Sequence, residues 1–167
     1  MQLTPKVRVM KVRAFADADL AAVFAIQLKC PHAAQWREAD YLQLAGDPLG
    51  TMLVAEVETA NPPEVAGFAA FHRVMDEAEL RNIAVGPPHQ RKGIARALLA
   101  EGIRTLQESG VRQLFLEVRA SNQPALAFYA AAGFQLLYTR HNYYHDPLED
   151  ALVMACDISA ILSPPSR

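Results

Sequence analysis

The segment Leu80–Ala100, LRNIAVGPPHQRKGIARALLA, decides the fold, because it joins an apolar strand, a loop and the start of a helix. Two prolines stiffen the loop, and Gly93 stands where the helix is expected to begin. Helix N-termini bind anions, because their first N–H groups lack internal partners and the helix dipole adds positive charge. Gly93 and Ala95 leave the backbone open to a bulky anion, while Arg91 and Lys92 add charge. The segment therefore predicts either a phosphate cradle or a capped surface loop with solvated cations.

Composition limits the kind of protein that carries this segment. The chain has 167 residues, 51% of them hydrophobic, which suits one domain with a buried core and a short tail at residues 163–167. A formal net charge of −2 argues against general nucleic-acid binding. No apolar run approaches the roughly 18 residues that span a bilayer, and no secretory leader is evident. Cys30 and Cys156 lack metal-type spacing, so we expect reduced thiols in a cytoplasmic protein.

Hydrophobic periodicity predicts the order of the elements. The expected order is strand, two helices, three strands, helix, strand, helix and two strands. The expected ranges are residues 7–15, 17 or 19 to 28, 36–45, 51–57, 65–74, 80–85, 93–109, 111–118, 122–132, 134–142 and 151–158. The acidic run Asp76, Glu77 and Glu79 is expected to form a solvated hairpin tip, and residues 143–145 a loop between the last two strands. This order implies a mixed sheet with helices on its faces.

Three blocks of sequence resemble the Gcn5-related N-acetyltransferases. QRKGIA at residues 90–95 is similar to their pyrophosphate motif, Q/R-x-x-G-x-G/A, and the expected element order is theirs. LRNIAV with PPHQRKGIARALL, then LEVRASNQPALAFYAAAGF, then RHNYYHDPLEDALVM, resemble the bacterial RimI-type enzymes, which acetylate the N-terminal alanine of a small-subunit ribosomal protein. The likeness extends from Leu80 to Met154 and is weak in the first third of the chain. It implies one N-acetyltransferase domain over residues 1–167, an α/β fold with a mostly antiparallel mixed sheet of about seven strands and about four helices.

The resemblance also implies acetyl coenzyme A as the co-substrate and no metal ion. The residues that would hold its pantetheine arm are Ile83, Ala84 and Val85. The residues that would wrap its pyrophosphate are Arg91, Lys92, Gly93, Ile94, Ala95 and Arg96. Asn122 would touch the cofactor too, with a plain helix cap as its structural alternative. The histidines show no spacing typical of metal ligands; they are His32, His72, His89, His141 and His145.

Acetyl transfer to an amine needs groups that move protons. Glu117 is an acidic residue in an apolar strand, on the same face as Gln113 and Phe115. The block LEVRASN aligns it with the family's general base, and a carboxylate that reaches solvent or pairs with Arg119 is the alternative. Tyr129, in LAFYAAAGF, matches the family's proton donor to the leaving thiolate; its alternative is a core aromatic residue. By resemblance, Glu117 is therefore the candidate base and Tyr129 the candidate acid.

The acceptor expected from the resemblance is a protein N-terminus, most directly a ribosomal protein. An α-amine, with a pKa of about 7.7–8.0, asks less of its base than a lysine at about 10.4. The candidate contacts to this substrate are Trp36, Tyr143 and Tyr144. Arg37 stands where the family carries a small hydroxyl residue, which removes a helix cap, and Glu149 and Asp150 either attract a cationic peptide or are simply solvated.

These expectations leave alternatives open. An acetyltransferase of other protein N-termini, of lysines or of a small amine has the same cofactor site. A non-catalytic acyl-coenzyme A binding domain would need neither Glu117 nor Tyr129, so the presence of both favours an enzyme. No nucleic acid and no membrane are expected as partners.

Overall fold

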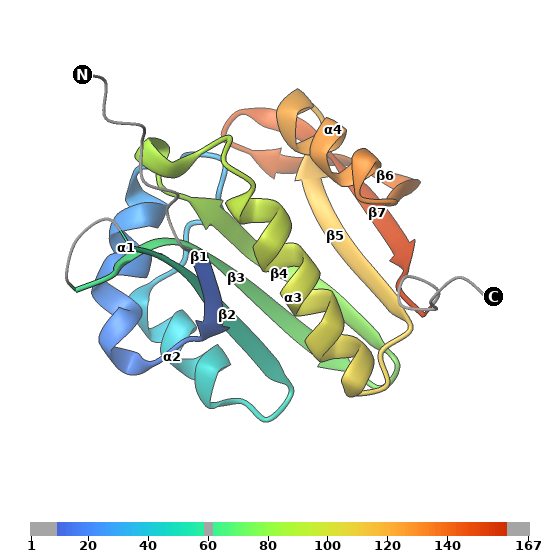
Figure 1. Ribbon diagram of the computed structural model, residues 1–167. Helices are drawn as coiled ribbons and strands as arrows, with labels where there is room; N and C mark the ends of the chain where they lie inside the picture. The colour runs from blue at the N-terminus through green and yellow to red at the C-terminus, as the bar shows by residue number, and fades with distance from the viewer. Residues whose placement is uncertain (1–9, 59–61, 160–167) are drawn as a thin grey trace, which may run out of the picture. The chain divides into compact units, whose positions relative to one another are not determined.

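The computed structural model describes residues 10–58 and 62–159, and it confirms the expected order of elements (Figure 1). The strands are β1 Met10–Ala14, β2 Gly50–Val57, β3 Glu64–Val74, β4 Glu77–Val85, β5 Gln113–Arg119, β6 Gln135–His145 and β7 Leu148–Asp157. The α-helices are α1 Leu20–Leu28, α2 Glu38–Gly46, α3 Ile94–Glu108 and α4 Gln123–Ala131, with short 3₁₀ turns η1 Asp17–Asp19 and η2 Pro87–His89. The first residues of the expected strand 7–15 and the expected tail lie outside the described ranges.

The strands form one seven-stranded mixed sheet with the order β1-β2-β3-β4-β5-β7-β6. β4 pairs with β5 in parallel, whereas β1 with β2, β5 with β7 and β6 with β7 are antiparallel. A parallel pair needs a crossover connection, and α3 supplies it between β4 and β5. The expected fold class, a mixed sheet of seven strands with four helices, is therefore confirmed for the described residues.

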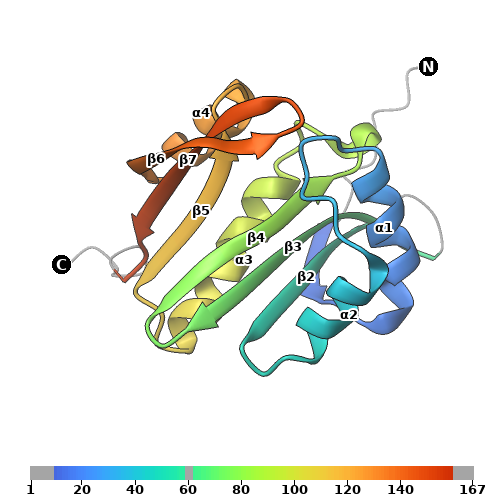
Figure 2. The same cartoon turned by 180° about the vertical axis from the view of Figure 1, so that it is seen from behind.

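The chain divides into two compact units, which we describe in turn: Met1–Phe71 with Asn82–Gly102, and His72–Arg81 with Ile103–Arg167. In the first unit, alternate residues of β3 contact helices on opposite faces. Phe68 belongs to the core formed with α1 and α2, where Tyr41 packs edge-on against it at 5.5 Å between ring centroids. Gly67 approaches Ile94 and Gly102 approaches Phe71, so α3 covers the other face (Figures 1 and 2).

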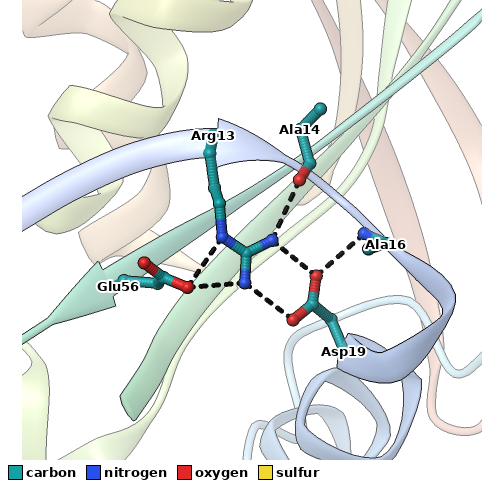
Figure 3. A network of polar contacts seen from close by, with 5 residues as sticks. All are labelled: Arg13, Ala14, Ala16, Asp19 and Glu56. Carbon is teal, nitrogen blue, oxygen red and sulfur yellow. Dashed lines mark hydrogen bonds and ion pairs between the residues drawn. The ribbon is translucent and has the colours of Figure 1, made fainter. Parts of the chain in front are cut away.

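Arg13 of β1 links this strand to the turn η1 and to β2 (Figure 3). Its guanidinium binds both carboxylate oxygens of Asp19 at 2.7 and 2.8 Å and Glu56 at 2.6 Å. Asp19 also accepts a hydrogen bond from the backbone N–H of Ala16 at 2.8 Å. The side chain of Asp19 makes no cap hydrogen bond to α1 and instead fixes the turn between β1 and α1.

In the second unit, β5 alternates between buried and partly exposed residues. Leu114, Leu116 and Val118 are buried, which leaves Glu117 on the more open face, as its alternation with apolar neighbours predicts. Helix α4 lies on one face of β5, β6 and β7 (Figures 1 and 2). It ends before Gly133, whose φ of +98° permits the turn into β6.

Two expectations about hairpins are wrong. Glu77 and Glu79 lie within β4, because Ala78 and Leu80 alternate with them as buried residues; only Met75 and Asp76 form the turn. Residues 143–145 lie within β6, and the chain turns at Asp146–Pro147. β6 is an edge strand whose residues are nearly all exposed, so it lacks the alternation from which strands are recognised.

Candidate functional site

The N-terminus of α3 in the first unit has the features of an anion cradle. The carbonyl of Gly93 accepts a hydrogen bond from Ala97 N at 3.1 Å, which makes Gly93 the residue before the first helical turn. Among the described residues, no backbone carbonyl accepts from the N–H groups of residues 91–96. These groups are the ones that an anion at a helix N-terminus would bind.

The loop before α3 has a conformation that keeps this end open. Arg91 and Gly93 have positive φ angles of +61° and +82°, and a Cβ at Gly93 would meet nothing within 4 Å. Gln90 Nε2 donates to the carbonyl of Val85 at 2.9 Å, and Lys92 Nζ donates to Pro88 O at 3.1 Å. The free N–H groups, the open glycine and nearby cations therefore fit a pyrophosphate. Because the side chain of Ile94 is buried, only its backbone N–H is available to bind the anion.

The neighbouring strand residues fit a pantetheine arm less directly. Ile83, Ala84 and Val85 end β4, as expected, but the carbonyl of Val85 already accepts from Gln90 and from Cys30 Sγ at 3.3 Å. Partial burial raises the pKa of the Cys30 thiol, which suits a hydrogen-bond donor and not a nucleophile. The backbone of Ile83 and Ala84 remains the better candidate for contacts to the arm.

Glu117 lies in a cavity of about 360 Å³ in the second unit. Its carboxylate forms an ion pair with Arg140 Nε at 3.2 Å, and the side chain of Glu117 is 23% exposed. Tyr143 lies beside Glu117, whose charge raises the pKa of that tyrosine. Arg119, the partner considered from the sequence, instead pairs with Glu149 at 3.4 Å. Glu117 is thus a partly buried carboxylate that is paired with Arg140 of β6.

The same cavity contains residues that the sequence did not indicate. Its wall includes aromatic, charged and imidazole side chains: His72, Glu77, Glu79, Phe115, Tyr138 and Arg140. Desolvation and the charge of Glu117 raise the pKa of Glu79, whereas the charges of Arg81, Arg140 and His72 oppose this shift; Glu79 is nevertheless an exposed residue. The period-two pattern of residues 77–82 carried the signal for Glu79, since it predicts a longer β4.

Tyr129 is buried in α4, 7% exposed, and its ring packs edge-on against Phe134 at 5.6 Å. Burial raises its pKa above the ordinary value, so the hydroxyl stays protonated at neutral pH, as a proton donor must. Tyr129 is not among the residues that line the cavity of Glu117. Asn122 caps the same helix, accepting a hydrogen bond from Ala125 N at 3.3 Å; this confirms the cap and does not exclude a contact with the cofactor.

The candidate substrate contacts differ in their surroundings. Trp36 packs on the core of the first unit, 5.0 Å from the ring of Tyr41, and its backbone is held by Gln27. Tyr144 lies under the guanidinium of Arg119 at 3.9 Å, whereas Tyr143 is 44% exposed beside Glu117. Tyr143 is therefore the contact best placed to meet an acceptor.

Two further expectations concern local contacts. Arg37 precedes α2, and the carboxylate of Asp40 accepts from its backbone N–H at 2.9 Å, so a cap exists without a hydroxyl residue at that position. Glu149 accepts from Ser121 N at 2.6 Å and Asp150 from Asn142 N at 2.8 Å. Glu149 thus holds the turn at Ser121 and Asp150 holds the backbone of β6 at Asn142, which argues against a free acidic patch for a peptide.

An open helix N-terminus, a mixed sheet and a partly buried carboxylate paired with an arginine suit an acyltransferase, and comparison with known proteins agrees. The chain belongs to the acetyltransferase (GNAT) family, whose model matches residues 20–134. The chain is accordingly an acetyl-CoA-dependent N-acetyltransferase.

Particular relatives resemble most of the chain. It is 39% identical over 150 residues to the [ribosomal protein bS18]-alanine N-acetyltransferase of Escherichia coli K12, covering 89% of this chain and 97% of that protein. The enzyme of the same name from Salmonella typhimurium is 40% identical over 147 residues, covering 86% and 95%. The crystal structure of the ribosomal-protein-S18-alanine N-acetyltransferase from Escherichia coli superposes with a TM-score of 0.79 at 37% identity, covering 95% of this chain and 99% of that one.

Proposed function

We propose that this chain acetylates the N-terminal alanine of the ribosomal protein bS18. The observation that carries the proposal is the 39% identity to an enzyme of that name across 97% of that enzyme's length. Such coverage includes the segments that bind both substrates, and not only the cofactor motif that the whole family shares. A ribosomal substrate would place the enzyme in the cytoplasm. Among the described residues, no helix is long and apolar enough to cross a membrane.

In this reaction acetyl coenzyme A supplies an acetyl group activated as a thioester. The cradle of residues 91–96 would hold its pyrophosphate, with Ile83, Ala84 and Val85 along the pantetheine arm and Asn122 as a further contact. The free N–H groups at the start of α3 and the open position at Gly93 support this assignment.

The residues of the second unit would handle protons and the acceptor. Glu117 accepts a proton from the amine, directly or through water, and its ion pair with Arg140 supports this role by orienting the carboxylate. Tyr129 donates a proton to the departing thiolate, for which its burial and protonated state at neutral pH are suited. Tyr143 and Tyr144 would contact the peptide.

An acetylation assay on a panel of peptides tests the proposal. The peptides begin with Ala-Arg, Ser, Met or Thr, and a control peptide with a blocked N-terminus contains an internal lysine. We expect the alanine peptide to be acetylated fastest and its N-terminal amine to be the site found by mass spectrometry. Acetylation of the lysine control alone would refute the proposal. Equal rates on all N-terminal peptides would leave an N-terminal acetyltransferase of broad specificity.

A further inference from the structure

The cavity around Glu117 contains a second carboxylate that the proposed reaction does not use. Glu79 of β4 stands opposite Phe115 of β5, and Glu117 lies two residues further along β5 on the same face as Phe115. Residues along a strand rise about 3.3 Å each and adjacent strands lie about 4.8 Å apart, so the two Cα atoms are separated by about 8 Å. Glu79 and Glu117 therefore line the same cavity but lie far enough apart to bind two different groups of a substrate.

Arg140, the arginine that lines the cavity, is already paired with Glu117. Arg140 Nε pairs with Glu117 at 3.2 Å, and Arg140 Nη2 contacts the hydroxyl of Tyr138 at 3.1 Å. The charges of Arg81, Arg140 and His72 act on the carboxylate of Glu79 and favour its ionised form. Desolvation raises its pKa, with a further contribution from Glu117. A partly desolvated carboxylate that lines a cavity is stabilised by an incoming cation.

We propose that Glu79 determines specificity by binding the cationic side chain of a lysine or arginine directly after the acceptor residue of the peptide. This inference rests on the proposed function, in which Glu117 serves the N-terminal amine. Consecutive Cα atoms of a peptide lie about 3.8 Å apart. If Glu117 serves the N-terminal amine, a long side chain on the second residue is able to reach Glu79, whose Cα lies about 8 Å from that of Glu117.

The walls of the cavity suit such a side chain. Phe115 and Tyr138 offer apolar surface to the methylene groups of a lysine or arginine, while Glu79 meets the charged end. A volume of about 360 Å³ accommodates one extended side chain beside the acceptor residue. Arginine is the better partner of the two, because its planar guanidinium binds a carboxylate through two parallel hydrogen bonds.

Steady-state kinetics on matched peptides test the inference. The peptides are identical except for their second residue, which is Arg, Gln or Glu after an N-terminal alanine. We expect the wild-type enzyme to favour the Arg peptide over the Gln peptide about tenfold in kcat/KM, mainly through KM, as one charge-assisted contact predicts. Glu79→Gln should bring this ratio close to one, and Glu79→Arg should make the Glu peptide the preferred substrate.

A control variant separates a local contact from overall charge. Glu108→Gln removes the same charge from an exposed position at the end of α3, and we expect it to keep the wild-type ratio. The KM for acetyl coenzyme A and the melting temperature of each Glu79 variant show whether its fold and cofactor site are intact.

The outcomes distinguish the two proposals. If the wild type acetylates N-terminal alanine but treats Arg and Gln peptides alike, or if its preference survives Glu79→Gln, the role of Glu79 is wrong and the proposed function stands. If no N-terminal amine is acetylated, the proposed function fails and this inference fails with it. A preference that is lost in Glu79→Gln and reversed in Glu79→Arg supports both.

Discussion

Arg140 of β6 forms an ion pair with Glu117 of β5 although β7 lies between the two strands. The register explains how it does so. Val153 of β7 pairs with Glu117 on one side and Tyr138 on the other, and Ala151 pairs with Arg119 and Arg140 in the same way. The small side chain of Ala151 allows Arg140 to lean across β7 to Glu117. The proposed base is therefore oriented by a residue from a strand that it does not adjoin.

We expect Arg140→Gln to lower kcat/KM for the acceptor peptide about tenfold, because Glu117 loses its charged partner and remains close to Glu79. Arg140→Lys keeps the charge without the same geometry and should recover part of the loss. Initial rates at varied peptide concentration measure the effect, with the KM for acetyl coenzyme A as a control that should not change. Wild-type kinetics in Arg140→Gln would show that the ion pair has no part in catalysis.

Glu117→Gln and Tyr129→Phe test the proton-transfer roles. Each variant should lower kcat by an order of magnitude or more, the usual contribution of a positioned acid or base, roughly 10²–10⁴-fold. Acetyl coenzyme A should still bind, since neither residue belongs to the cradle at α3. Titration calorimetry with the cofactor, beside single-turnover rates, makes the distinction. Two variants with full activity would rule out both assignments.

Much of the fold could be predicted because the signals are local. The apolar positions of α3 are all buried: Ile94, Leu98, Leu99, Ile103 and Leu106. Gly110 follows the helix with a φ of +83°, the left-handed conformation expected of a glycine at a helix end. Alternation along β5 placed Glu117 on the open face. In contrast, the pairing of Glu117 with Arg140 depends on the strand order β5-β7-β6, which no local pattern encodes. The length of β6 was missed for a related reason, because an edge strand exposed on both faces has no apolar period.

Gly93 and Gly110 offer a matched test of the cradle. Both have φ angles above +80°, at +82° and +83°, and a Cβ at either would meet nothing within 4 Å. Gly93→Ala and Gly110→Ala should therefore each lower the free energy of unfolding by about 1–2 kcal/mol, through backbone strain alone. Only Gly93→Ala should also weaken the binding of coenzyme A, since Gly93 lies at the proposed pyrophosphate site. Urea unfolding and calorimetric Kd values measure the two effects; equal Kd values in both variants would contradict the cradle.

The network of Arg13, Asp19 and Glu56 makes stability depend on pH (Figure 3). The hydrogen bonds from Arg13 hold the pKa of Asp19 below its ordinary value, against the opposing effect of burial. A carboxyl whose pKa is lower in the folded state stabilises that state fully above its unfolded pKa of about 3.9. This stabilisation is lost as the pH falls below about 3.9 and through the lower folded value.

We therefore expect Asp19→Asn to reduce the free energy of unfolding by about 1–3 kcal/mol at pH 7, the range for hydrogen bonds to charged groups. The difference from wild type should stay constant between about pH 5 and 8 and narrow below about pH 4, because the wild-type carboxylate then also becomes protonated. Asp17→Asn is the control, since Asp17 is an exposed acid in the same turn. Urea unfolding at pH 7 and at about pH 3.5 gives the comparison. A difference of equal size at both pH values would mean that Asp19 contributes by shape and neutral hydrogen bonding, and not by its charge.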